Sequence, residues 1–276
     1  MLQVGFYLHK EFTVSETTEK ETYAARQDDL LKLTTIWDEA SNGTPQVIRL
    51  SGVLGAGKRA MVGHVCRHAK LQNEDTLLIR PTFTDEENGQ GVMVKLYASL
   101  FGSIHAIGGT LRGRIEMAMS NLIPQKSQRV QNWLENFVSG MKQSVPKPGE
   151  EQFQVVIPKD NPLAGYVEIV LALSQSFPML IDFQNVHNIH SLPIAATFEA
   201  LINELKQRND SKLMVIFQML PVEENKGWLS QPLIDILDNP DRIQNIELQR
   251  WTTEDVMKYI NTKEDTSVNA SEEIAS

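Results

Sequence analysis

The chain has 276 residues, which suits one large domain or two small ones. Apolar residues make up 41% of it, enough for a sizeable core, and the formal net charge of −9 argues against a broad basic surface of the kind that coats nucleic acid. The single cysteine excludes an intrachain disulfide, and without a secretory leader or a long apolar stretch the chain is expected to be cytoplasmic, with no membrane partner.

The N-terminal third predicts an arm followed by helix, strand and helix. Residues 1–22 begin apolar and become polar, so we expect an N-terminal arm that is loosely held. Residues 28–40 carry apolar side chains at helical spacing. Residues 47–50 are short, mostly apolar and bounded by Pro45 and Ser51, which is typical of a buried strand, and residues 60–69 have the composition of a helix.

The turn between that strand and helix nearly completes a P-loop. Residues 52–59 read GVLGAGKR, and the pattern G-x-x-x-x-G-K-[ST] fails only at its last position. Glycines let backbone N–H groups approach a phosphate, the helix N-terminus favours an anion, and the lysine reaches the β- and γ-phosphates. We therefore predict a phosphate-binding set comprising Gly52, Gly55, Ala56, Gly57, Lys58 and Arg59. The alternative is a glycine-rich connection with no ligand.

Arg59 stands where the pattern has a serine or threonine, whose hydroxyl would bind Mg²⁺. A guanidinium has no lone pair to offer a metal. It could donate to a phosphate directly, or it could point into solvent while a water completes the metal shell. The motif therefore predicts phosphate binding more strongly than hydrolysis, and Mg²⁺ stays an open question.

The middle of the chain predicts a strand, a helix and then a helical insertion. The strand covers residues 76–79 and the helix residues 92–101, and residues 102–150 form the insertion, with helices at 112–122 and 127–141. Several lysines and arginines there accompany Trp133 and Phe137, so nucleic-acid binding is one interpretation. Helical spacing and acidic neighbours favour packing roles for both aromatic residues.

From residue 163 onward, helices and strands alternate. Helices are predicted at 163–176, 192–208, 228–237 and 252–259, with strands at 179–182, 213–217 and 243–248. Strands joined through long helices predict a parallel sheet covered by helices on both faces, an α/β fold of the P-loop NTPase kind. Residues 261–276 are polar and acidic and are predicted to be disordered.

Asp182 ends one of these strands and completes the predicted site. A P-loop needs an acid at the carboxyl end of a nearby strand to hold the Mg²⁺ shell, so Asp182 is our candidate metal ligand and catalytic group. The alternative is a carboxylate that caps the junction of strand and loop. Gln184 and Asn185 could orient an attacking water, as an amide does in some GTPases, but hydrogen bonding within the loop is the favoured role.

Residues 178–192, PMLIDFQNVHNIHSL, resemble the Walker B segment of the STAND class of AAA-related P-loop ATPases. Residues 23–27 resemble the segment of that class that lies near the adenine, which implies a base-binding role for Arg26. Residues 215–224 and 246–259 resemble its sensor strand and closing stretch. The resemblance covers roughly residues 22–101 and 162–260. It implies one P-loop domain over residues 23–260 that binds ATP or ADP.

The chain departs from this class where hydrolysis is concerned. The second acid of the Walker B segment falls on Phe183, its third aspartate on Asn188, and the arginine after the sensor strand near Leu220. We therefore expect a regulatory switch or assembly module with weak or absent hydrolysis, which meets a protein partner or another copy of itself. An active Mg²⁺-dependent ATPase and a scaffold without nucleotide are the alternatives. Nucleic acid bound through the insertion is not favoured.

Overall fold

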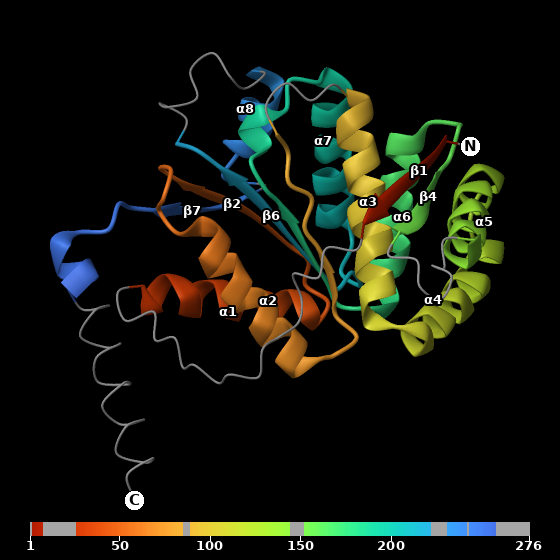
Figure 1. Ribbon diagram of the computed structural model, residues 1–276, viewed down its shortest axis with the longest axis horizontal. Coiled ribbons are helices and arrows are strands. Elements are labelled where there is room, and N and C mark those ends of the chain that lie inside the picture. The colour runs from red at the N-terminus through yellow and green to blue at the C-terminus, as the bar shows by residue number, and fades with distance from the viewer. Residues whose placement is uncertain are drawn as a thin grey trace, which may run out of the picture.

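The computed structural model describes residues 2–7, 26–84, 89–143, 152–221, 231–241 and 243–257. Within these ranges the architecture is α/β, with a parallel five-stranded sheet between layers of helices, as predicted (Figure 1). The strands lie in the order β3-β5-β6-β2-β7. Their bounds are β2 (Gln46–Gly52), β3 (Leu77–Ile79), β5 (Met179–Phe183), β6 (Leu213–Met219) and β7 (Gln244–Leu248).

The helices follow the predicted alternation closely. Their bounds are α1 (Gln27–Ser41), α2 (Lys58–Gln72), α3 (Gly89–Ile107), α4 (Gly109–Leu122), α5 (Gln128–Gln143), α6 (Pro162–Ser176), α7 (Leu192–Gln207) and α8 (Gln231–Leu237). Local signals explain some of these starts: α6 has a proline in its first turn, and the side chain of Asn161 accepts from the N–H of Ala164. No helix in the described part of the chain combines the length and apolarity that a membrane crossing requires.

The two faces of the sheet pack against different helices (Figure 1). Along β6, Met214 and Ile216 belong to a core shared with α1 and α2, whereas Val215 and Phe217 belong to the larger core shared with α3, α6 and α7. Successive side chains of a strand point to opposite faces. The same alternation along β5 puts Asp182 on the side of α1 and α2 and puts Phe183 on the opposite side.

A separate antiparallel pair joins the chain start to a segment that the sequence left unassigned. Strand β1 (Leu2–Tyr7) pairs with β4 (Gln152–Ile157), so the expectation of a loosely held arm over 1–22 is wrong for residues 2–7. The backbone groups of a strand gain partners only when a second strand lies beside them, and here that strand is far along the chain. The rest of the predicted arm, residues 8–22, and the predicted tail, residues 261–276, lie outside the described residues.

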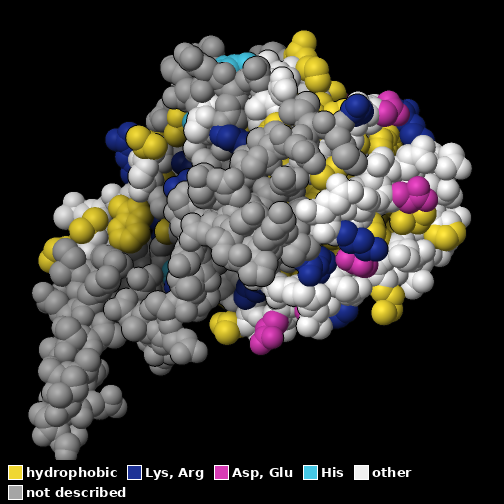
Figure 2. Space-filling view, turned by 45° about the vertical axis from the view of Figure 1, so that its right-hand side comes forward, with side chains coloured by type: hydrophobic (Ala, Val, Ile, Leu, Met, Phe, Trp, Pro, Cys, Tyr) yellow, Lys and Arg dark blue, Asp and Glu magenta, His cyan; other side chains and the backbone are white. Residues whose placement is uncertain are grey.

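The predicted insertion consists mainly of α4 and α5, and its aromatic residues pack internally. Trp133 and Phe137 are buried, which confirms the packing interpretation, and the indole of Trp133 donates to the carbonyl of Asp160 at 2.8 Å. Lys142 pairs with Glu116 at 3.5 Å. Figure 2 shows lysine and arginine side chains mixed with acidic ones on the coloured part of this face. Among the described basic residues of the insertion, Arg114, Arg129 and Lys142 each have an acidic partner.

Candidate functional site

The glycines of the loop between β2 and α2 have steric reasons to be glycine. Gly55 and Gly57 have φ of +80° and +87°, a region that other residues rarely adopt. A Cβ on Gly52 would lie 2.7 Å from the carbonyl oxygen of Leu248 on the adjacent strand β7. Gly57 immediately precedes α2, so the loop delivers the chain directly to a helix N-terminus, where N–H groups lack intrahelical partners.

Lys58 lies against the inside of the loop. Its ammonium donates to the carbonyl oxygens of Gly52 and Val53, the latter at 3.0 Å. The N–H of Ala56 donates to the carbonyl of Val53 at 3.1 Å and closes the turn. Leu54 at the tip is 90% exposed, so the largest apolar side chain of the loop does not fill it. An anion entering the loop would take the ammonium from the two carbonyls.

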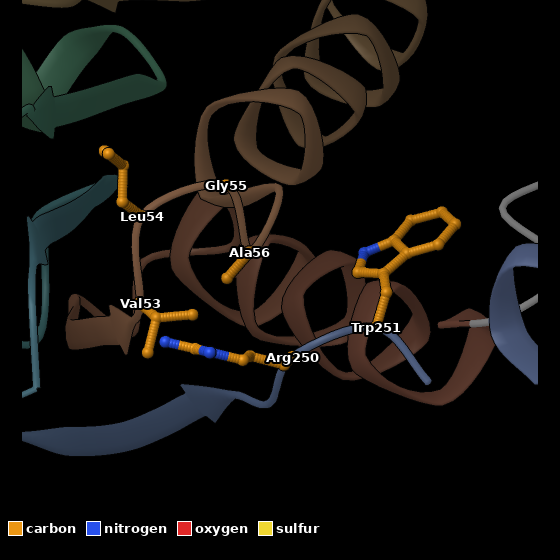
Figure 3. Close-up of a pocket in the computed structure, with 6 residues that line it drawn as sticks. All are labelled: Val53, Leu54, Gly55, Ala56, Arg250 and Trp251. Atoms are coloured by element: carbon orange, nitrogen blue, oxygen red, sulfur yellow. The ribbon is translucent and has the colours of Figure 1, made fainter. Parts of the chain in front are cut away.

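A cavity of about 490 Å³ opens beside the loop. Its lining comes from the loop and from the segment that follows β7, and consists of Val53, Leu54, Gly55, Ala56, Arg250 and Trp251 (Figure 3). In Figure 3, Arg250 runs toward Val53 while the indole of Trp251 stands beside the turn. The volume falls in the range of small-molecule sites, and an aromatic face with basic neighbours suits a base and its phosphates.

Arg26 lies at the same edge of the sheet, next to Trp251. Its guanidinium sits over the indole at 5.8 Å from the ring centroid and donates to the carbonyl of Gln249. The structure thus brings Arg26 beside Trp251, which lines the cavity next to the glycine loop, although residues 23–25 lie outside the described residues. Arg250 and Trp251 were not predicted from the sequence as site residues. The available signal was their position directly after a parallel strand, since ligands gather at the carboxyl ends of such strands.

Asp182 is fully buried, and both of its carboxylate oxygens accept hydrogen bonds. Oδ2 accepts from Nε of Arg80 at 3.0 Å and from the amide of Gln184 at 2.7 Å, and Oδ1 accepts from the amide of Gln218 at 2.6 Å. Arg80 directly follows β3 and Gln218 lies on β6, the two strands that flank β5. Parallel pairing of three strands therefore assembles this cluster.

Gln184 connects the carboxylate to Arg59 in the first turn of α2. Its Oε1 accepts from Nε of Arg59 at 3.0 Å and from the hydroxyl of Thr82 at 3.0 Å. The orientation of the amide follows from its partners, because a carboxylate requires a donor and a guanidinium requires an acceptor. The side chain of Gln184 therefore bonds to β5, to α2 and to the segment after β3, not within its own loop as predicted, and it links Arg59 to Asp182.

This donor set does not fit the expected magnesium role. Mg²⁺ demands oxygen ligands in near-octahedral geometry, but Arg59 replaces the hydroxyl and Asp182 is paired with Arg80. Removing one partner from a buried ion pair costs about 3–5 kcal/mol. In the described ranges, no group of three or more His, Cys, Asp or Glu side chains is placed to hold a metal ion. As Asp182 lies in this structure, its surroundings suit a structural anion better than a metal ligand.

Phe183 packs on the face of the sheet opposite Asp182. Its ring lies 4.7 Å from that of Phe198, 5.1 Å from that of Phe217 and 6.3 Å from that of Phe83, measured between centroids. Asn188 is also buried and donates to the carbonyl of Phe83 at 3.1 Å. The two residues that the resemblance places at Walker B acids are therefore packing residues: Phe183 lies on the opposite face of the sheet, and Asn188 is bound to backbone.

Cys66 lies on the inner face of α2. Burial raises the pKa of its thiol to about 12, and the nearby positive charge of Arg80 opposes this only in part. The thiol is therefore neutral at physiological pH and does not serve as a nucleophile.

Leu220, the weakest position of the resemblance, directly follows β6, but residues 222–224 of the loop after it lie outside the described residues.

No protein-family model matches the chain, and no curated protein matches it either.

Proposed function

We propose that this chain is a P-loop domain that binds an adenine nucleotide and acts as a regulatory switch or assembly module, with weak or absent hydrolysis. The observation that carries the proposal is the loop itself: two glycines in left-handed conformation and a lysine at its inner edge, directly before a helix. This arrangement offers backbone N–H groups and one ammonium to a polyphosphate.

The cavity beside the loop gives the rest of the nucleotide a place. With phosphates at the loop, a base could stack on Trp251, whose other neighbour is the guanidinium of Arg26. Stacking on an aromatic ring is tolerant of base identity, so the choice of adenine depends on the STAND resemblance. The protein partner and self-association expected from that resemblance belong to the same proposal.

Weak hydrolysis follows from the groups near the loop. A water attacking the γ-phosphate needs a group that orients it or accepts its proton. Phe183 is buried on the far face of the sheet, and the carboxylate of Asp182 is already held by Arg80, Gln184 and Gln218. Neither residue, as placed, can serve an attacking water.

The hydrogen bonds of Lys58 suggest how the loop could differ between the free and the nucleotide-bound forms. Binding of a phosphate would draw the ammonium of Lys58 away from the carbonyls of Gly52 and Val53. The free and bound forms would then differ in the hydrogen bonds of the loop, next to the exposed side chain of Leu54. A partner that contacts this edge would distinguish the two forms, since a ligand shifts only those equilibria in which the two states bind it differently.

Thermal unfolding with ATP, ADP and GTP, measured alongside phosphate release, tests the proposal. A nucleotide at a hundred times its dissociation constant should stabilise the fold by about 2.7 kcal/mol. Lys58→Ala should abolish that shift, while Lys70→Ala, at the other end of α2, should keep it. Stabilisation by no nucleotide would contradict the proposal and favour a scaffold. Phosphate release at an ordinary ATPase rate, lost in Asp182→Ala, would favour an active enzyme.

A further inference from the structure

We infer that this site takes its nucleotide in the metal-free form, with the guanidinium of Arg59 in the place and electrostatic role that Mg²⁺ has in metal-dependent P-loops. The inference rests on the proposed nucleotide-binding function and names the ionic form of the ligand.

The position of Arg59 supports this role. It follows Lys58 directly and lies in the first turn of α2, where backbone N–H groups and the helix dipole already favour an anion. Its Nε is bound to Oε1 of Gln184 at 3.0 Å, and the residue is otherwise exposed. A guanidinium has five N–H donors in a rigid fork, so this bond restrains one of them and leaves the terminal groups to donate to phosphate oxygens.

The cluster around Gln184 explains why a guanidinium is held there. Gln184 can accept from Arg59 because its own amide donates to Asp182 at 2.7 Å. Asp182 in turn has its charge balanced by Arg80 at 3.0 Å. Asp182, which would hold the Mg²⁺ shell in a metal-dependent P-loop, thus orients Arg59 through Gln184.

The balance of charge at the loop favours an unchelated ligand. Lys58 and Arg59 lie where the loop joins α2, Arg250 lines the adjoining cavity and Arg26 lies over Trp251, whereas Asp182 is paired with Arg80. Chelation by Mg²⁺ cancels part of the negative charge of a triphosphate and occupies oxygens that these cations would contact. Attraction between the ligand and four basic side chains therefore falls when the metal is bound.

Titration of the full chain with ATP in excess EDTA and in excess Mg²⁺ tests the inference. The dissociation constant in EDTA should lie below the value in Mg²⁺. Arg59→Ser, which restores the P-loop pattern, should weaken binding in EDTA by about tenfold to a hundredfold, the usual worth of a charge-assisted hydrogen bond. Arg67→Ser makes the same change of charge farther along α2 and should leave both constants unchanged.

Arg59→Lys separates charge from geometry. Lysine keeps the positive charge but has no planar fork, so binding in EDTA should fall between that of the unaltered chain and that of Arg59→Ser. Urea unfolding of each variant without ligand checks that the fold is intact. Binding that requires Mg²⁺, or an Arg59→Ser variant that binds as tightly in EDTA as the unaltered chain, would overturn the inference and leave the proposed function standing. Binding of no nucleotide in either condition would overturn both.

Discussion

Arg80 and Asp182 form an ion pair across two adjacent parallel strands, with Nε of the arginine 3.0 Å from Oδ2 of a carboxylate that is wholly buried. Arg80 follows β3 and Asp182 lies near the end of β5, so the pair lies at the carboxyl ends of the strands, where the glycine loop also begins. The acid that a metal-dependent P-loop would offer to Mg²⁺ therefore has a cation of the protein as its partner.

Loss of one member of this pair should destabilise the fold strongly. Asp182→Ala should lower the free energy of unfolding by about 3–5 kcal/mol, because the guanidinium of Arg80 is then left largely buried without its counter-charge. Urea denaturation measures the change. Arg80→Met should also destabilise, and the double variant should cost less than the sum of the two single changes. Additive effects would show that the pair contributes no coupling.

Gly52 and Gly63 should respond in opposite ways to the same substitution. Gly52→Ala should lower the free energy of unfolding by about 1–3 kcal/mol, because its Cβ would lie 2.7 Å from the backbone oxygen of Leu248, which moves only if β7 moves. Gly63→Ala is the matched control within α2: among the described residues its Cβ would meet nothing within 4 Å, so it should stabilise by about 0.5–1 kcal/mol. Equal effects would contradict the close approach of the loop to β7.

Trp251 should contribute to nucleotide affinity through stacking. Trp251→Ala should weaken binding by about 1–3 kcal/mol, the usual worth of one base–aromatic stack, while Trp251→Phe should keep most of it. Isothermal titration with ATP measures both. Trp133→Phe, in α5, serves as the control, since that indole is buried and donates to Asp160 away from the cavity. An unaltered affinity in Trp251→Ala would place the base elsewhere.

Restoring an acid at position 183 should not restore hydrolysis. The side chain at this position packs against three phenylalanine rings on the face opposite Asp182, so Phe183→Glu buries a carboxylate among them. We expect a loss of more than about 3 kcal/mol in unfolding free energy and no gain in phosphate release. Phe183→Leu, the apolar control, should cost about 1 kcal/mol. Phosphate release that rises in Phe183→Glu would show that β5 can present this position to the loop.

The strands and helices were largely predictable because their signals are local. The buried strand over 47–50, the glycine turn and the helix after it lie within one short stretch of chain, and all three are confirmed. The pairing of β1 with β4 was not predictable, because the two strands lie about 150 residues apart in the chain. Neither segment by itself specifies which residues of the other it pairs with. The resemblance to STAND proteins and the nucleotide itself stay predictions.

The sequence by itself determined the turn of the loop, since the left-handed conformations of Gly55 and Gly57 and the position of Lys58 depend on neighbours along the chain. Only the tertiary structure decided what Asp182 faces. Arg80, Gln184 and Gln218 reach its two oxygens from different segments, and the register of parallel strands places them there. Trp251 and Arg26 meet for the same reason, being more than 200 residues apart in the chain. Hydrogen bonds between distant segments depend on how the sheet is assembled, which no local pattern of residues specifies.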